Sequence, residues 1–173
     1  MAERQETTAK SSRRHESLVP LSREHQYGLL LCLRIHRGLP EKAADASWLE
    51  KKAAQTVEFF KGDLAAHFAA EEEVLFPAMR EIPEAAALIA ELLAQHREIE
   101  SLARALEPSE EDFLPGTLKR FADLLEAHIR KEERELFPIY EQAAAPVVTE
   151  AVGRGVRKFI GEALKPKHPE LFD

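Results

Sequence analysis

The chain has 173 residues, enough for one domain with a substantial hydrophobic core. Alanine, leucine, glutamate, lysine and arginine dominate and only seven glycines occur, a composition that favours an all-α protein. The net charge of −7 leaves no basic surplus to neutralise phosphates, so we expect no nucleic-acid binding. A single cysteine excludes an internal disulfide, and neither a membrane-spanning apolar stretch nor an apolar signal segment occurs. We therefore expect a soluble cytoplasmic protein with no membrane contact.

The N-terminal part of the sequence predicts a tail and two helices. Residues 1–17 are polar and charged without a hydrophobic period, which predicts a flexible tail. A first helix is expected from Ser22, a suitable N-cap, to Gly38. A second is expected from Ser47, where Glu50 three residues later completes a capping box.

The remaining sequence predicts three more helices. The second helix ends or kinks at Pro77. A third helix should cover residues 83–107, and a fourth should follow the Pro115-Gly116-Thr117 break and run to about residue 142. A shorter amphipathic helix is predicted over residues 147–164, and residues 165–173 are expected to form a tail.

These elements predict the fold class. Four helices with short connections suggest an up-down-up-down four-helix bundle over residues 18–143. Residues 144–173 add a short C-terminal helix, expected to cap the bundle, and a tail. The order of motifs repeats between the two halves of the bundle, so we expect a pseudo-twofold axis relating them.

The repeated motif is the most informative feature of the sequence. His67-Phe68-Ala69-Ala70-Glu71 and His128-Ile129-Arg130-Lys131-Glu132 are each followed by a second Glu and then by Leu-Phe-Pro. Residues four apart lie on one face of a helix, so each segment directs one imidazole and one carboxylate toward the same point. Facing each other in a bundle, the two segments would make a metal site.

The core-facing stripes of the predicted helices contain further histidines and carboxylates. Four histidines lie on the stripes of four different helices, and three of them are followed by a glutamate at the fourth position. Carboxylates that converge in a dry core repel each other unless a cation neutralises them. The predicted metal ligands are His25, His67, Glu71, His96, Glu100, His128 and Glu132.

Seven ligands exceed the needs of a single ion, so we predict two metal ions. Glu71 and Glu132, the symmetry-related pair, are expected to bridge them, and Glu100 is expected to be a terminal ligand. A salt bridge from Glu100 to Arg97 or Arg104 is the alternative. Imidazole and carboxylate donors in a six-coordinate bridged site suit iron or manganese better than zinc.

The pattern of His25, His67-x-x-x-Glu71, His96 and His128-x-x-x-Glu132, with Leu-Phe-Pro after both pairs, resembles the hemerythrin-like (HHE cation-binding) family. The resemblance implies a four-helix bundle with a non-haem di-iron centre, two iron ions bridged by an oxide or hydroxide, with manganese less favoured. It also implies binding, sensing or reduction of small oxidants such as dioxygen, peroxide or nitric oxide. The oxygen-carrying members have a histidine where Glu100 stands, and a carboxylate there would stabilise ferric iron and disfavour reversible oxygen carriage.

Other interpretations remain open from the sequence alone. The chain could instead be a di-iron oxidoreductase with catalase- or peroxidase-like activity, or an iron donor in iron–sulfur cluster repair. Whether it is an enzyme, and its oligomeric state, are not fixed. Glu72, Glu133, Glu24 and Gln95 adjoin the predicted ligands and are expected to be solvated or outer partners, and Cys32 a buried packing residue rather than a redox group.

Overall fold

The computed structural model describes residues 13–43, 45–107 and 113–161, and the regular elements in these ranges are helical. The elements, including three wider π-helical segments labelled η, are α1 (Val19–Lys42), α2 (Ala46–Phe59), η1 (Phe60–Leu64), α3 (Ala65–Ala70), η2 (Glu71–Leu75), α4 (Phe76–Ala78), α5 (Pro83–Ala105), α6 (Leu114–Lys131), η4 (Glu132–Leu136), α7 (Phe137–Ala143) and α8 (Pro146–Ile160). The segments from α2 to α4 form one continuous rod, and those from α6 to α7 form another.

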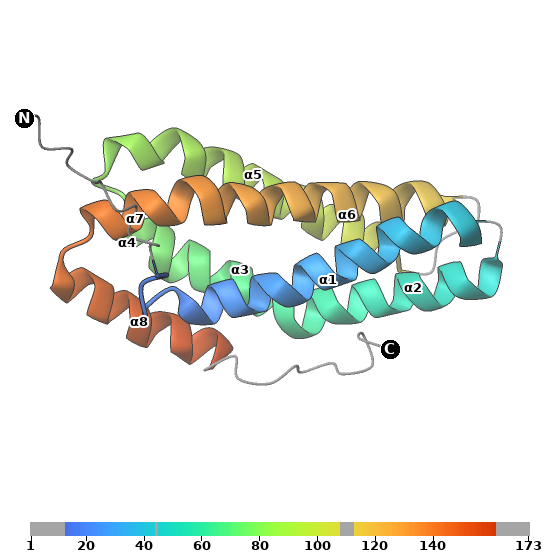
Figure 1. Cartoon of the computed structure of the whole chain (residues 1–173), viewed down its shortest axis with the longest axis horizontal. Helices are drawn as coiled ribbons and strands as arrows, with labels where there is room; N and C mark the ends of the chain where they lie inside the picture. The colour runs from blue at the N-terminus through green and yellow to red at the C-terminus, as the bar shows by residue number, and fades with distance from the viewer. Residues whose placement is uncertain (1–12, 44, 108–112, 162–173) are drawn as a thin grey trace, which may run out of the picture.

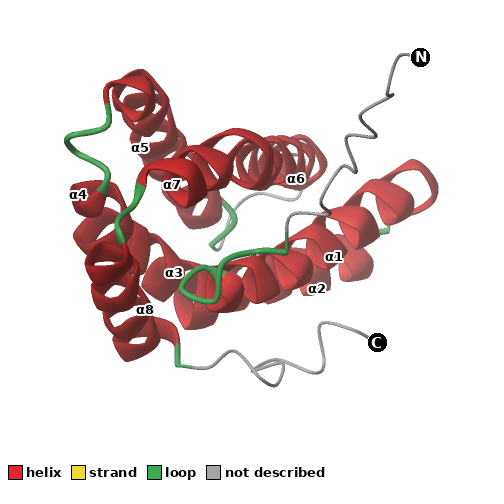
Figure 2. Cartoon of the chain, turned by 60° about the vertical axis from the view of Figure 1, so that its left-hand side comes forward, coloured by secondary structure: helices red, strands yellow, loops and turns green. Residues whose placement is uncertain are grey.

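These two rods, together with the single helices α1 and α5, make an up-down-up-down bundle of four rods, which confirms the predicted fold (Figure 1). α6 contacts both α1 and α5, while α8 turns back along the bundle and packs against α3, η2 and α1 (Figure 2). None of the helices in the described residues combines the length and apolar composition needed to cross a membrane.

The interior of the bundle has two apolar clusters with a polar layer between them. The first cluster contains Leu31, Phe59, Phe68, Leu102, Phe121 and Leu125, and the second contains Leu21, Leu75, Leu92, Phe137, Tyr140 and Val156. In α1, His25 lies between Leu21 of the second cluster and Leu31 of the first. Along each of the other three rods, the buried side chains likewise pass from one apolar cluster to the other near the histidine, which is His67, His96 or His128. The polar layer is therefore closed off by apolar side chains on both sides.

The first helix is longer than its sequence predicts. α1 spans Val19–Lys42, so Ser22 and Gly38 lie within it and Pro40 lies in its last turn. Gly38 does not end the helix; it allows close packing, because a Cβ atom there would lie 2.1 Å from the Trp48 ring. Since the constraint at this glycine comes from a neighbouring helix and not from a left-handed turn, the helix continues past it.

Two other predicted helix starts are also corrected. Asp45, not Ser47, is the N-cap of α2: its side chain accepts a hydrogen bond of 3.0 Å from the Trp48 backbone N–H. Pro115 does not break the chain before the fourth rod but lies in the first turn of α6, which begins at Leu114. A proline is tolerated there because the first turn needs no intrahelical N–H donor.

The residues just before α1 are attached to the bundle, although the sequence predicts a flexible tail there. Arg14 forms ion pairs of 2.6 Å with Glu133 and 3.0 Å with Glu141, and the Ser17 hydroxyl lies 3.1 Å from that of Tyr140. Residues 1–12 and the predicted C-terminal tail, residues 165–173, lie outside the described residues, and α8 ends at Ile160.

Candidate metal centre

Two π-helical segments begin at the repeated glutamates. Phe76 donates its backbone N–H to the Glu71 carbonyl, and Phe137 donates to that of Glu132, so each turn closes over five residues instead of four. Pro77 and Pro138 follow directly. A proline lacks an N–H and clashes with the carbonyl four residues before it, and the wider turn accommodates both constraints. The Leu-Phe-Pro repeat thus shapes the backbone where each glutamate enters the core.

Six of the seven predicted ligands meet in one buried cluster between the apolar layers. Their potential donor atoms fall into two groups that share both carboxylates, and within each group the atoms lie within 4.8 Å of one another. We call these groups the His25 half (His25 and His67 with Glu71 and Glu132) and the His96 half (His96 and His128 with the same two glutamates). Glu71 and Glu132, which were expected to bridge two ions, belong to both groups.

The spacing of the donor atoms suits metal coordination. Glu71 lies 3.2 Å from the Nε2 atom of His67 and 3.3 Å from that of His96. Glu132 lies 3.2 Å from the Nε2 of His25 and 3.3 Å from that of His128. Donors that bind one ion at about 2.1 Å and at right angles lie roughly 3 Å from each other.

The cluster contains buried polar atoms that nothing in the described chain satisfies. Both carboxylate oxygens of Glu71 and of Glu132, and the Nε2 atoms of His96 and His128, have no hydrogen-bond partner. Each such atom costs about 1–3 kcal/mol, and more when it is charged. Cations bound between these atoms would satisfy all six, so the donor set fits metal ions.

Each histidine is oriented by a partner on another rod. The Nδ1 atoms of His25 and His96 lie 2.7 Å from Glu133 and 2.8 Å from Glu72. The Nδ1 atoms of His67 and His128 lie 3.0 Å from the side-chain oxygens of Glu24 and Gln95. An Nδ1–H that donates to oxygen leaves the Nε2 lone pair directed into the cluster, ready to bind a cation.

Without a cation, the buried carboxyl and imidazole groups shift one another's pKa values. Burial, reinforced by the Glu71 carboxylate, raises the pKa of Glu132 to about 7. Burial would also raise the pKa of Glu71, but the neighbouring imidazoles of His67 and His96 hold it well below its usual value. Burial lowers the pKa of an imidazole, yet adjoining carboxylates raise it above the usual value in three of them, His25, His67 and His96. In His128 burial prevails and the pKa lies well below 6.5.

The predicted role of Glu100 as a ligand is not met. Its carboxylate is part-exposed, lies outside both halves, and pairs with Arg104 at 2.5 Å and Arg97 at 3.7 Å. The alternative, a salt bridge to a neighbouring arginine, is therefore what the structure has. Each half retains two imidazoles and a share of two carboxylates, and the argument that Glu100 would disfavour reversible oxygen carriage no longer applies.

The sequence left open whether the residues beside the predicted ligands are solvated or are outer partners of the histidines. For Glu24 and Gln95 the structure has the second alternative, because they contact His67 and His128. Arg14, placed in the predicted tail, pairs with Glu133, and together with His25 and Ser22 it holds the pKa of that carboxyl at about 2 although burial would raise it. The position of Glu24 and Gln95, each directly before a ligand histidine in related helices, is the signal that indicated them as possible partners.

Cys32 is buried as predicted, with 1% of its surface exposed. Burial, together with the nearby Glu126 charge, raises the pKa of its thiol to about 12. Since the thiolate is the reactive form, we expect no alkylation of the folded protein by iodoacetamide at pH 8 and rapid modification after denaturation. Mass spectrometry of both samples checks this; modification of the folded chain within minutes would contradict it.

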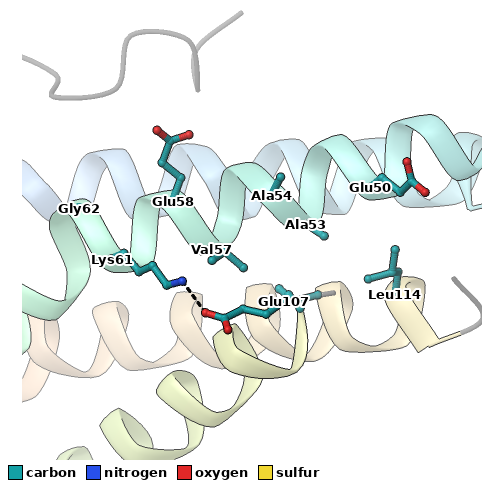
Figure 3. A pocket seen from close by; sticks show the side chains of 10 residues that line it. Glu50, Ala53, Ala54, Val57, Glu58, Lys61, Gly62, Glu107 and Leu114 are labelled. Carbon is teal, nitrogen blue, oxygen red and sulfur yellow. Dashed lines mark ion pairs between the residues drawn. The ribbon is translucent and has the colours of Figure 1, made fainter. Parts of the chain in front are cut away.

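One surface pocket on the described part of the chain is separate from the cluster. It has a volume of about 920 Å³ and lies between α2, η1 and the facing ends of α5 and α6 (Figure 3). Its walls are mainly apolar, with an ion pair between Lys61 and Glu107 at one side. None of the six clustered residues lines it.

Comparison with known families agrees with this picture. The sequence matches the family model of the hemerythrin HHE cation binding domain over residues 18–140. The match extends from the start of α1 to α7 and includes all six clustered residues. No curated protein and no solved structure matches the chain.

Proposed function

The chain belongs to the hemerythrin HHE cation-binding domain family, and from this we propose that its buried cluster holds two iron ions that react with small oxidants. The observation that carries the proposal is the set of six buried donor atoms without a hydrogen-bond partner. They belong to residues that contribute to two ligand groups with both carboxylates in common. Two ions bridged by Glu71 and Glu132 use every one of these atoms.

The donor set favours iron. Each ion would receive two imidazole nitrogens and oxygens of two carboxylates, which leaves positions open on an ion that prefers six donors. Zinc prefers four-coordinate sites and in closed sites often uses thiolate, which this cluster lacks. Manganese accepts the same donors and is the second candidate.

The surroundings of the cluster favour small oxidants such as dioxygen, peroxide or nitric oxide. The cavity beside His25 and His67 has a volume of about 10 Å³, close to what a single water molecule needs. A pair of ferrous ions supplies two electrons, which with two protons reduce dioxygen to hydrogen peroxide, or hydrogen peroxide to water. The two apolar clusters keep bulk water away, and the oriented imidazoles hold their Nε2 atoms toward the ions.

We also propose that the protein works in a reducing compartment, the cytoplasm. This is supported by its single cysteine, which is buried and free in the structure.

Iron loading followed by oxidant addition tests the function. Metal-free protein, loaded anaerobically with ferrous iron and freed of excess by gel filtration, should retain two irons per chain. Addition of dioxygen should produce near-ultraviolet charge-transfer absorption, and dithionite should remove it. Failure to retain iron under these conditions would refute the proposal.

The same sample separates a binding or sensing protein from an enzyme. Hydrogen peroxide in large excess should be consumed stoichiometrically with the iron if the protein binds or senses oxidants. Sustained consumption with release of dioxygen would identify a catalase-like oxidoreductase instead.

A further inference from the structure

The polar layer has a pseudo-twofold symmetry that is broken at three positions. His25 and His67 in one half correspond to His96 and His128 in the other, and the partners Glu133 and Glu72 correspond as well. At the remaining partner position, however, His67 contacts the carboxylate of Glu24 while His128 contacts the neutral amide of Gln95. The two halves therefore have unequal charge around matched ligands.

A second difference between the halves also places more negative charge in the His25 half. Asp63, four residues before His67, is buried and lines the small cavity beside the His25 half together with Glu24. The corresponding position four residues before His128 is Leu124, an apolar residue. The His25 half thus has two buried carboxylates where the His96 half has an amide and a hydrocarbon side chain.

An arginine accompanies the outer glutamate of each half. Arg14 pairs with Glu133 beside the His25 half, and Arg97 pairs with Glu72 beside the His96 half. Arg14 is the less exposed of the two, with 22% of its side chain exposed against 62% for Arg97, so its charge offsets part of the difference. What distinguishes the halves is Glu24 and Asp63 against Gln95 and Leu124.

Aromatic contacts differ between the halves as well. The Phe68 ring stacks on His96 with 3.7 Å between ring centroids, whereas the residue related to Phe68 by the pseudo-symmetry is Ile129. Both halves also have a phenylalanine ring from the Leu-Phe-Pro motif, Phe137 at 5.5 Å from His25 and Phe76 at 5.7 Å from His96, so the closer Phe68 ring is an additional cover on the His96 half.

From these contacts we infer that the His25 half is the stronger cation site and fills first, and that Glu24 and its counterpart Gln95 set this order by acting through His67 and His128. A carboxylate that accepts the Nδ1–H makes an imidazole a more basic ligand than an amide does, and buried negative charge attracts a divalent cation. Outer partners of this kind change metal affinity about 10- to 100-fold. The inference rests on the proposed function, since it requires two ions in one cluster.

Calorimetric titration of the metal-free full chain with Co²⁺ tests the order of binding. The unsubstituted protein should bind two ions in two resolved steps that differ at least about tenfold in affinity. Glu24→Gln should weaken the tight step by about 10- to 100-fold and leave the other in place, so that the steps merge. Gln95→Glu should also make the two steps merge, in this case by strengthening the weak step.

The exchange variant, with Glu24→Gln and Gln95→Glu together, is the matched control. It keeps the number of carboxylates and should restore two resolved steps, which a merely structural role of either residue would not do. In the unsubstituted background, His67→Gln should abolish the tight step, and His128→Gln should abolish the weak step and spare the tight one.

The outcomes distinguish this inference from the proposed function. Two ions bound with equal affinity, or steps unaffected by either substitution in chains that unfold cooperatively, would overturn the order of filling and leave the two-ion cluster standing. Retention of fewer than two ions by the unsubstituted chain would overturn both.

Discussion

Removal of the metal ions by a chelator should lower the thermal unfolding midpoint by roughly 6–20 °C. Glu71 and Glu132 are fully buried and share a layer with four buried imidazoles, so in an empty cluster only bound protons offset the buried carboxylate charge. Leaving buried charge without its partner costs about 3–5 kcal/mol, and each kcal/mol shifts the midpoint of a chain this size by about 2–4 °C. Calorimetric scans of the loaded and chelated protein measure the difference.

Two controls separate metal loss from other effects of the chelator. Adding ferrous iron back anaerobically should restore the original midpoint, because the ligands come together only in the folded chain. A variant with strongly weakened metal binding, such as Glu132→Ala, should show a much smaller difference between its midpoints with and without chelator. An unchanged midpoint in protein shown by elemental analysis to have lost its ions would contradict the expectation.

Helical periodicity, together with the duplicated motif, was enough to place the six clustered residues on the inner faces of their helices. A spacing of four puts His67 above Glu71 and His128 above Glu132, and the duplicated motif implies that the two pairs face each other. These inferences need only the geometry of a single helix and the symmetry of a bundle. The four-helix fold was predictable for the same reason, since each apolar stripe has one face to bury.

Glu100 shows where this reasoning fails. It follows His96 by four residues, as Glu71 follows His67, yet it lies at the surface of α5. The pseudo-symmetry relates α5 to α1, where the residue four after His25 is Leu29, also part-exposed. In these two helices the buried residue after the histidine is the third, Ile99 or Gly28, so a spacing of four points away from the cluster. Which side of a stripe faces inward depends on how the helices are rotated in the bundle, and that is a property of tertiary packing.

The sequence could not assign the possible outer partners to particular histidines, for a related reason. Glu24 contacts His67 and Glu133 contacts His25, and in each pair the two residues belong to different rods. Such contacts depend on the distance and angle between rods, which a single-sequence pattern does not contain. The same holds for Arg14, whose anchoring on Glu133 depends on a chain segment with no periodicity of its own.

Replacement of a shared carboxylate should have the largest effect on metal binding. Glu132 contributes to both halves, so Glu132→Ala should weaken the binding of both ions by more than the roughly 100-fold expected for losing an outer partner. Replacement of a histidine that serves one half, as in His128→Ala, should cost one ion and spare the other. Elemental analysis after anaerobic loading and gel filtration gives the number of ions retained.

Glu100→Ala is the matched control for this experiment. It removes a glutamate at the same spacing from a histidine, but the Glu100 carboxylate pairs with Arg104 on the exposed side of α5 and contributes to neither half. We expect two ions per chain and a nearly unchanged midpoint, because an exposed ion pair contributes only about 0.2–1 kcal/mol. If Glu100→Ala lost an ion while Glu132→Ala kept both, the shared carboxylates would not be the bridges, and the cluster would have to be assigned differently. If both variants kept two ions, the metal would lie outside this buried layer altogether.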